Sequence, residues 1–268
     1  MKNSRNNINT RRNEILKVIE NRRQISTQEL NAMFDASPLT LRRDLDFWEE
    51  EGCVERYYGG VRYIVPEKET PQFDEKLQSN TMEKQVIARY IASLIEPEKT
   101  IFMNSGTTIY EVMRCLRDRR ETIITNNVLA VDACTGGNCE IICTGGTYNH
   151  ITRSYNGELA TSIIQKTFAD YCVLGVNGIS IKAGITTSIF QETIVNELML
   201  ERCSGQKIVA ADSSKIGKIF RFTSVALDKI DLLVTTSAAA PEELAAITAA
   251  GVKVAFADQV TNMDGIAN

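Results

Sequence analysis

The sequence of 268 residues is poor in metal-binding side chains, with a single histidine (His150) and no CxxC pair. A zinc centre needs several Cys or His ligands at close spacing, so we predict no metal site. The cysteines stand at irregular positions, mostly in apolar stretches, which favours buried, reduced thiols in a reducing cytoplasm. They are residues 53, 115, 134, 139, 143, 172 and 203.

Long apolar runs are also missing. No uncharged apolar stretch approaches the ~18 residues of a membrane span, so we expect no membrane partner. The N-terminus is polar and basic, without the apolar core of a signal peptide, which argues against secretion and for a cytoplasmic protein. The GxGxxG and Walker A patterns are absent, so neither NAD nor ATP is indicated and no cofactor is predicted.

Positive charge is not in excess, because 30 Lys and Arg stand against 34 Asp and Glu, for a formal net charge of −4. Its distribution is uneven. Residues 1–23 hold seven basic and two acidic side chains (+5), whereas residues 1–65 hold eleven and ten (+1), which leaves −5 for the remainder. This balance excludes a protein coated in positive charge but leaves room for a local patch facing DNA.

Residues 37–62, SPLTLRRDLDFWEEEGCVERYYGGVR, are the most informative stretch that is present. Ser37 suits a helix N-cap and Pro38 the first helical turn. Leucines and a tryptophan at positions 41, 45 and 48 form an apolar stripe, which leaves basic and hydroxyl side chains on the other faces. Gly52 ends this predicted helix, and residues 57–62 are typical of a turn between two short strands.

The preceding residues complete a helix-turn-helix pattern. A first helix is expected over residues 10–22, and Ser26 with Glu29 forms a capping box that opens a second helix. With the ribbon that follows, these segments predict a winged helix-turn-helix whose third helix enters the major groove of double-stranded operator DNA. The plainer alternative is a three-helix packing module, because capped amphipathic helices are common.

The polar side chains of this module are the predicted DNA contacts. Thr40 and Arg43 are the candidates for base edges. One module buries little surface for operator affinity, so a homodimer or homotetramer is expected. The candidates for phosphate contacts are Arg11, Arg12, Arg42, Arg56 and Arg62, and Ser37 and Tyr58 complete the predicted set.

The remainder of the chain alternates strands with helices. We predict a DNA-binding domain over residues 1–65, a polar linker over 66–73 and a second domain over 74–268, which opens with a helix over 74–95. Continuous apolar runs separated by helices predict a doubly wound, mostly parallel α/β sheet. The predicted strands are 100–104, 121–125, 140–144, 170–176, 206–211, 231–235 and 252–256, and the helices are 107–118, 127–135, 156–167, 190–203 and 241–250.

Polar and glycine residues gather where these strands end, which is where open α/β sheets bind ligands. Ser105 to Thr108 open a helix, so amides and hydroxyls would converge on an anion, to which Lys215 adds a positive charge. A small phosphorylated polyol is therefore the predicted ligand, and the alternative is that these are ordinary loop and capping residues. The loops are residues 104–108, 125–127, 144–146, 177–178 and 212–215.

These motifs resemble the DeoR family of bacterial transcriptional regulators. Residues 10–62 are similar to its helix-turn-helix, through Thr40-Leu41-Arg42-Arg43-Asp44-Leu45 and the Tyr58-Gly59-Gly60 turn, and residues 75–258 are similar to its sugar-phosphate sensor domain. The resemblance implies a regulator, usually a repressor, of a carbohydrate operon, with a sensor similar in fold to ribose-5-phosphate isomerase.

The resemblance also implies roles for single residues. Ser105, Gly106, Thr107 and Thr108 would cradle a phosphate that Lys215 neutralises, and the sugar hydroxyls would be read by Asn126, Asn127, Asp212 and Glu192. The predicted ligand-binding set is completed by Asn104, Thr125, Gly145, Gly146, Asn177, Gly178, Thr186 and Thr187.

The sequence departs from the family pattern at a few positions. Asn104 stands where Asp is usual, Asn196 and Glu197 stand where basic residues are frequent, and Tyr58 stands where His is usual. A competing hypothesis is a sugar-phosphate isomerase-like enzyme with an accessory DNA-binding module, in which Asp212 or Glu192 is the base and Lys215 steadies an enediolate. We predict no catalytic residue, because no second base stands beside the single histidine.

Overall fold

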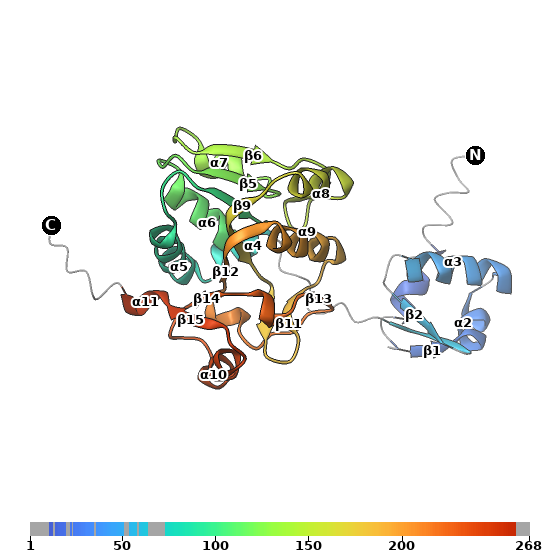
Figure 1. Cartoon of the computed structure of the whole chain (residues 1–268). Coiled ribbons are helices and arrows are strands. Elements are labelled where there is room, and N and C mark those ends of the chain that lie inside the picture. The colour runs from blue at the N-terminus through green and yellow to red at the C-terminus, as the bar shows by residue number, and fades with distance from the viewer. Residues whose placement is uncertain are drawn as a thin grey trace. The chain divides into compact units, whose positions relative to one another are not determined.

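The chain divides into two units, residues 1–70 and 71–268, in a computed structural model (Figure 1). The structure describes residues 11–12, 14–19, 22, 24–34, 36–50, 54–57, 59–63 and 73–260. The predicted helix end at Gly52, the hairpin residue Tyr58 and most of the predicted linker lie outside these ranges.

The first unit packs helices against a small antiparallel sheet. Residues 11–12, 14–19 and 22 are helical and are followed by α2 (Thr27–Met33) and α3 (Pro38–Glu50). The strands β1 (Gln24–Ser26), β2 (Val54–Tyr57) and β3 (Gly60–Tyr63) lie in the order β1-β3-β2. The predicted capping box is present at the start of α2. The core consists of Ile15, Ile19, Ile25, Leu30, Leu41, Leu45, Val54 and Val61.

Strand β1 was not predicted from the sequence. It has only three residues, too few to show an alternating pattern, and it forms because Ile25 pairs with Val61 of β3 in the core. The β2–β3 hairpin turns at Gly59, whose φ of +86° favours glycine, and its carbonyl accepts a hydrogen bond of 3.0 Å from the Thr27 amide. The β2–β3 hairpin, which is the wing of the predicted winged helix-turn-helix, is thereby joined to the start of α2.

The second unit is built on a seven-stranded parallel sheet in the order β15-β14-β12-β9-β4-β5-β6. Its strands are β4 (Thr100–Met103), β5 (Thr122–Thr125), β6 (Glu140–Cys143), β9 (Ala169–Gly175), β12 (Cys203–Ala210), β14 (Leu232–Thr235) and β15 (Lys253–Phe256). These are the seven strands predicted from the apolar runs, and every neighbouring pair is parallel. The predicted doubly wound fold is confirmed.

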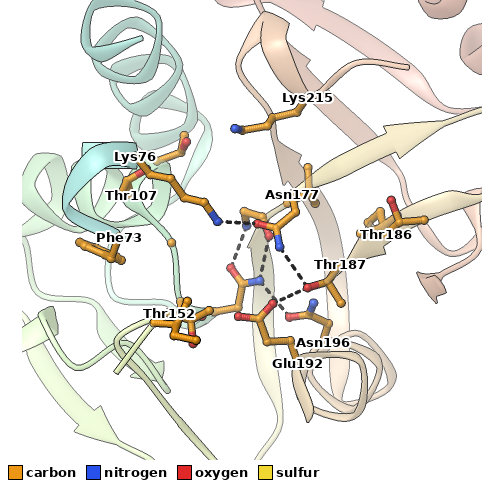
Figure 2. A pocket seen from close by; sticks show the side chains of 18 residues that line it. Phe73, Lys76, Thr107, Thr152, Asn177, Thr186, Thr187, Glu192, Asn196 and Lys215 are labelled. Atoms are coloured by element: carbon orange, nitrogen blue, oxygen red, sulfur yellow. Dashed lines mark hydrogen bonds between the residues drawn. The ribbon is translucent and has the colours of Figure 1, made fainter. Parts of the chain in front are cut away.

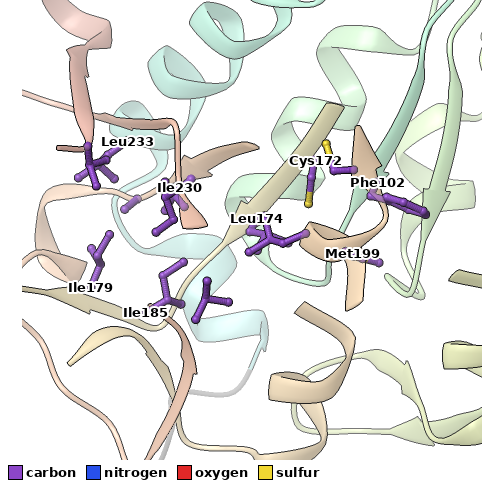
Figure 3. Close-up of a cluster of buried hydrophobic side chains, with 14 of the residues drawn as sticks. Phe102, Cys172, Leu174, Ile179, Ile185, Met199, Ile230 and Leu233 are labelled. Atoms are coloured by element: carbon purple, nitrogen blue, oxygen red, sulfur yellow. The ribbon is translucent and has the colours of Figure 1, made fainter. Parts of the chain in front are cut away.

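Helices cover both faces of this sheet (Figure 1). They are α4 (Phe73–Gln78), α5 (Thr81–Leu94), α6 (Thr107–Leu116), α7 (Ala130–Cys134), α8 (Glu158–Gln165), α9 (Phe190–Glu201), α10 (Pro241–Ala249) and α11 (Ala257–Val260), with short 3₁₀ turns η1 (Ser213–Lys215) and η2 (Leu227–Lys229). Successive strand residues point to opposite faces, so Val173 packs with Ile91 and Met113 on one side, whereas Leu174 packs with Phe102 and Met199 on the other. Figure 3 shows the second of these two cores.

The predicted helix over residues 74–95 is wrong in one respect, because two helices replace it. Asn80 adopts a left-handed conformation (φ 50°, ψ 34°) between α4 and α5, which breaks the helical path. The buried Lys84 ammonium donates to the carbonyls of Lys76 and Ser79 at the end of α4, which satisfies groups that a helix end leaves unpaired. Phe73, the last residue of the predicted linker, is buried and begins α4.

Short antiparallel strands near the sheet were also not predicted. They are the hairpin β7 (Thr147–Asn149) and β8 (Ser154–Asn156), and the sheet of β10 (Gly178–Ser180), β11 (Gly184–Thr187) and β13 (Phe222–Val225). Strands of three or four residues rich in Gly, Ser and Thr lack the apolar signal that marked the central strands. Both elements lie beside the carboxyl ends of the parallel strands and shape the site there.

The described residues bear on three expectations, which concern membrane-spanning helices, metal sites and the state of the cysteines. No helix among them combines the length and hydropathy needed to cross a membrane. In the same ranges, no cluster of three or more His, Cys, Asp or Glu side chains could hold a metal ion. The described cysteines are free thiols, and Cys134, Cys172 and Cys203 are buried, while Cys115 is exposed.

Candidate functional site

A polar pocket lies at the point where the strand order of the sheet reverses. Strands β4 and β9 are neighbours there, and the chain continues from β4 toward β6 and from β9 toward β15. The pocket contains about 650 Å³ of space free of atoms, partly open to solvent. Its lining residues are Phe73, Lys76, Asn104, Ser105, Gly106, Thr107, Thr108, Ile151, Thr152, Gly175, Val176, Asn177, Ile185, Thr186, Thr187, Glu192, Asn196 and Lys215 (Figure 2).

The N-terminus of α6 forms one wall of this pocket. Its N-cap, Gly106, has φ +142° and no side chain, so the first amides of the helix receive no side-chain cap. Amides in the first turn have no partner within the helix, and together with the helix dipole they favour an anion. The hydroxyls of Thr107 and Thr108 belong to the same turn. This wall is suited to a phosphate group.

Two lysines bring positive charge to the pocket. Lys76 reaches into its middle from α4, and Lys215 reaches in from η1 on another side (Figure 2). The pKa of Lys76 is lowered to about 8, mainly by burial; Glu192 opposes this shift, and Lys215 and Lys84 contribute to it. Since Glu192 is the one carboxylate among the lining residues, the pocket holds an excess positive charge.

A chain of hydrogen bonds connects Lys76 to Glu192 along the pocket wall (Figure 2). The Lys76 ammonium donates to Asn177 Oδ1 (3.1 Å), Asn177 Nδ2 donates to Thr187 Oγ1 (3.1 Å), and the Thr187 hydroxyl donates to Glu192 Oε2 (2.6 Å). Burial raises the pKa of the Glu192 carboxyl group, although the bond from Thr187 works against this shift. These groups offer donors and acceptors to the hydroxyls of a bound polyol.

Asn104 is held in the pocket floor by a buried amide network. Its Nδ2 donates to Asn196 Oδ1 and to the Gly175 carbonyl, both at 2.9 Å, and its Oδ1 accepts from the Gly175 amide at 2.8 Å. Asn196 Nδ2 in turn donates to Ser224 Oγ at 3.1 Å. A carboxylate at position 104 could not donate to these oxygens. Asn104 and Asn196, which both depart from the family pattern, are thus hydrogen-bonded to each other.

The predicted ligand-binding residues fall into two groups by position. Ten line the pocket: Asn104, Ser105, Gly106, Thr107, Thr108, Asn177, Thr186, Thr187, Glu192 and Lys215. The remaining seven are not among its lining residues: Thr125, Asn126, Asn127, Gly145, Gly146, Gly178 and Asp212. The structure thus brings together the loops after β4 and β9 with η1 and α9, but not the loops after β5 and β6.

Three of these seven residues form hydrogen bonds with neighbouring segments of the chain. Asn127 Nδ2 donates to the Gly106 carbonyl (3.4 Å), which braces the turn at the start of α6. Asn126 Nδ2 donates to the carbonyl of Tyr155 in β8 (3.0 Å). The Asp212 carboxylate is fully buried and accepts from Asn80 Nδ2 (2.9 Å), so it joins η1 to the break between α4 and α5. These three residues fix the segments that surround the pocket, but they do not line it.

The ligand-set prediction missed several lining residues. Phe73 and Lys76 belong to α4, and Ile151 and Thr152 belong to the connection between β7 and β8. Asn196 was noticed only as a departure from the family pattern. No local signal distinguishes Lys76 from other lysines on amphipathic helices, because its role depends on contact with Asn177, 101 positions away. The amide pair at 104 and 196 is equally invisible without the fold.

In the first unit, most of the arginines predicted to contact DNA are paired with acids. Arg11 and Arg12 both bind the buried Asp44 through their Nε atoms, at 2.8 and 2.9 Å. Arg56 pairs with Asp46, and Arg62 pairs with Glu55. Arg11 and Arg12 thereby fasten the first helical segment to α3, which Trp48 reinforces by donating to the Arg12 carbonyl at 2.9 Å.

Arg42 and Arg43 of α3 are different. Both are exposed, and neither forms an ion pair with any residue that the structure describes. Ser37 caps the helix by accepting from the Thr40 amide (3.2 Å), and the two hydroxyls are 2.8 Å apart. The exposed face of α3 therefore presents two free guanidinium groups beside its capped N-terminus.

Comparison with protein families gives two matches. The model of the DeoR-like helix-turn-helix domain matches residues 11–67, and the model of the DeoR C terminal sensor domain matches residues 79–237. The chain belongs to the DeoR family. The predicted family is confirmed, and the protein is a DNA-binding transcriptional regulator rather than an enzyme. Helix α4 lies between the two matched ranges.

Full-length relatives agree with this assignment. The HTH-type transcriptional regulator GlpR of Haloferax volcanii is 29% identical over 91% of this chain and 96% of its own. GolR of Listeria innocua is 28% identical over 84% and 89%, and IolR of Bacillus subtilis is 29% identical over 79% and 84%. Among solved structures, ribose 5-phosphate isomerase A of Methanocaldococcus jannaschii aligns with a TM-score of 0.38 and 13% identity, over 51% of this chain and 55% of the other.

Proposed function

We propose that this DeoR regulator represses a carbohydrate-metabolism operon and is controlled by a phosphorylated sugar bound in the pocket of its second unit. The observation that carries this proposal is the convergence of an uncapped helix N-terminus and two lysines at the reversal of strand order. Such helix ends bind phosphate, and lysine adds a point charge. The carboxamide and hydroxyl groups around Glu192 supply partners for sugar hydroxyls.

The phosphate would lie against the first turn of α6, where Gly106 leaves the amides open. Lys215 would neutralise part of its charge. The sugar would extend toward Asn177, Thr187 and Glu192, which are linked by hydrogen bonds. The match to the family's C-terminal sensor domain supports a sensing role for this unit.

The DNA contacts would come from the exposed face of α3. Arg43 and Thr40 are proposed to read base edges, and Arg42 is proposed to hold a phosphate. Arg11 and Arg12 would serve mainly to brace α3, because the Nε atom of each is paired with the buried Asp44. We propose residues 1–65 as the DNA-binding domain, and a dimer or tetramer as the operator-binding form.

Regulation would follow from a shift in populations. A ligand can change operator affinity only by binding two arrangements of the protein with different strength. We propose that the sugar phosphate favours an arrangement of the DNA-binding modules that fits the operator poorly.

A thermal-shift screen of sugar phosphates, each paired with its free sugar, tests the ligand class. A ligand at about 100 times its dissociation constant stabilises its domain by about 2.7 kcal/mol. A phosphate ester should raise the melting temperature, whereas its free sugar should not. Gly106→Val should abolish the shift, because a side chain at φ +142° strains the loop and would project into open space at the phosphate position. Equal shifts for ester and free sugar would contradict the proposal.

The role of Arg43 is tested on the operator. Arg43→Ala should cost about 1–3 kcal/mol of operator affinity and relax specificity at one base pair. Arg120→Ala, at an exposed position of the second unit, is the matched control. An equal loss on all DNA sequences, with a reduced dependence on salt, would make Arg43 a phosphate contact instead.

A further inference from the structure

Helix α4 occupies a particular place in the chain. It is the first described element after β3, and residues 64–72 connect the two in sequence. Neither family match, at residues 11–67 and 79–237, includes its six residues. Two of these residues, Phe73 and Lys76, nevertheless line the pocket. The segment that leads from the DNA-binding unit to the sensor is thus also part of the pocket wall.

Lys76 lacks a partner that matches its charge. Its ammonium donates to Asn177 Oδ1, a neutral oxygen, and it forms no ion pair with any residue in the described ranges. An ammonium group can donate three hydrogen bonds, and burying a charge is unfavourable unless it is paired. An anion entering the pocket would therefore gain a strong, charge-assisted contact from Lys76.

Helix α4 is attached to the sensor through contacts around both of its ends. The Phe73 amide donates to the Ile151 carbonyl at 3.3 Å, and the last carbonyls accept from the buried Lys84 ammonium. Asn80, just after the helix, donates to Asp212 at 2.9 Å. Between these ends, the Lys76 side chain makes one hydrogen bond within the described residues, to Asn177, so a bound anion can change the contact between α4 and the pocket.

We propose that Lys76 binds the anionic group of the effector and that α4 conveys occupancy of the pocket to the linker. On binding, the Lys76 ammonium turns from Asn177 to the anion, which frees Asn177 Oδ1 to accept from a ligand hydroxyl. A displacement of α4 acts on the end of residues 64–72, which joins the helix at Phe73, and so biases the DNA-binding modules. This inference rests on the proposed sugar-phosphate site and adds the residue and the helix that read it.

The test uses the full chain and inorganic phosphate, with sodium chloride at equal ionic strength as reference. Phosphate affinity is measured by thermal shift and titration calorimetry, and the order of residues 73–79 by hydrogen exchange. Lys76→Met should weaken phosphate binding about 10- to 100-fold, the range of one charge-assisted hydrogen bond. Lys76→Arg should restore most of it. Lys182→Met, at an exposed position outside the pocket, is the matched control.

Phosphate should slow hydrogen exchange in residues 73–79 of the native protein, but not in Lys76→Met at phosphate concentrations that saturate each protein. Unchanged phosphate affinity in Lys76→Met, with loss in Gly106→Val, would overturn the role of Lys76 and leave the proposed pocket intact. Phosphate binding with no change of exchange in residues 73–79 would overturn the role of α4. Failure of the native protein to bind phosphate would overturn the proposed function and this inference together.

Discussion

Replacing Lys76 by methionine should stabilise the ligand-free protein. Methionine is unbranched and only one atom shorter than lysine, but it removes a charge that burial disfavours. The pKa of Lys76 falls from its ordinary value of 10.5 to about 8, which corresponds to about 3 kcal/mol of unfavourable interaction at pH 7. The hydrogen bond to Asn177 that is lost is worth about 1 kcal/mol, so the net gain should be about 1–3 kcal/mol.

The gain should depend on pH in a defined direction. Below pH 8 both the folded and the unfolded states hold the proton on Lys76, and the folded state bears the full cost. Between pH 8 and 10.5 the folded state loses this proton while the unfolded state keeps it, so the native protein gains stability as pH rises. The advantage of Lys76→Met should therefore be constant below pH 8 and shrink toward zero near pH 10.5. Glu192, Lys215 and Lys84, which face Lys76, are present in both proteins.

The assay is thermal and urea unfolding of the two full-length proteins from pH 6.5 to 10. For a unit of about 200 residues, about 1 kcal/mol shifts the melting temperature by roughly 2–4 °C. Lys182→Met, at an exposed position, should change stability by less than about 0.5 kcal/mol. Destabilisation by Lys76→Met at pH 7, or a gain that does not vary with pH, would refute the reasoning, because contacts of Lys76 would then outweigh its burial.

Three further outcomes are expected. Phosphate affinity of the native protein should fall as pH rises above 8, where Lys76 loses its charge, and this fall should be absent in Lys76→Arg; titration calorimetry at several pH values decides it. Asn104→Asp should destabilise the second unit by about 1–3 kcal/mol, because the Asn196 and Gly175 oxygens lose a donor, and Asn196→Lys added to it should recover part of the loss in chemical unfolding. Ser26→Ala should cost the first unit about 1 kcal/mol in the same assay, through loss of the capping box, and an unchanged midpoint would contradict that.

Much of the architecture could be predicted from local patterns. The seven central strands were recognisable because strands buried on both faces need continuous apolar residues. The start of α2 was predictable because a capping box involves only Ser26 and Glu29, three positions apart. Strand β1 and the short antiparallel strands beside the central sheet were not predictable, because they form only when another strand supplies partners. Ile25 in β1, for example, needs Val61.

The site divides in the same way. By itself the sequence determined which residue types stand at the strand ends, where a helix begins at Thr107, and which face of α3 carries arginines, since these follow from neighbours within a few positions. Only the tertiary structure decided that Lys76 meets Asn177, that Asn104 bonds Asn196, and that Asp44 occupies Arg11 and Arg12. Each of these contacts joins side chains that lie 32 to 101 positions apart in the sequence. Only the packing of the chain brings such groups together, and this packing sets their charge, their hydrogen-bond partners and their exposure to solvent.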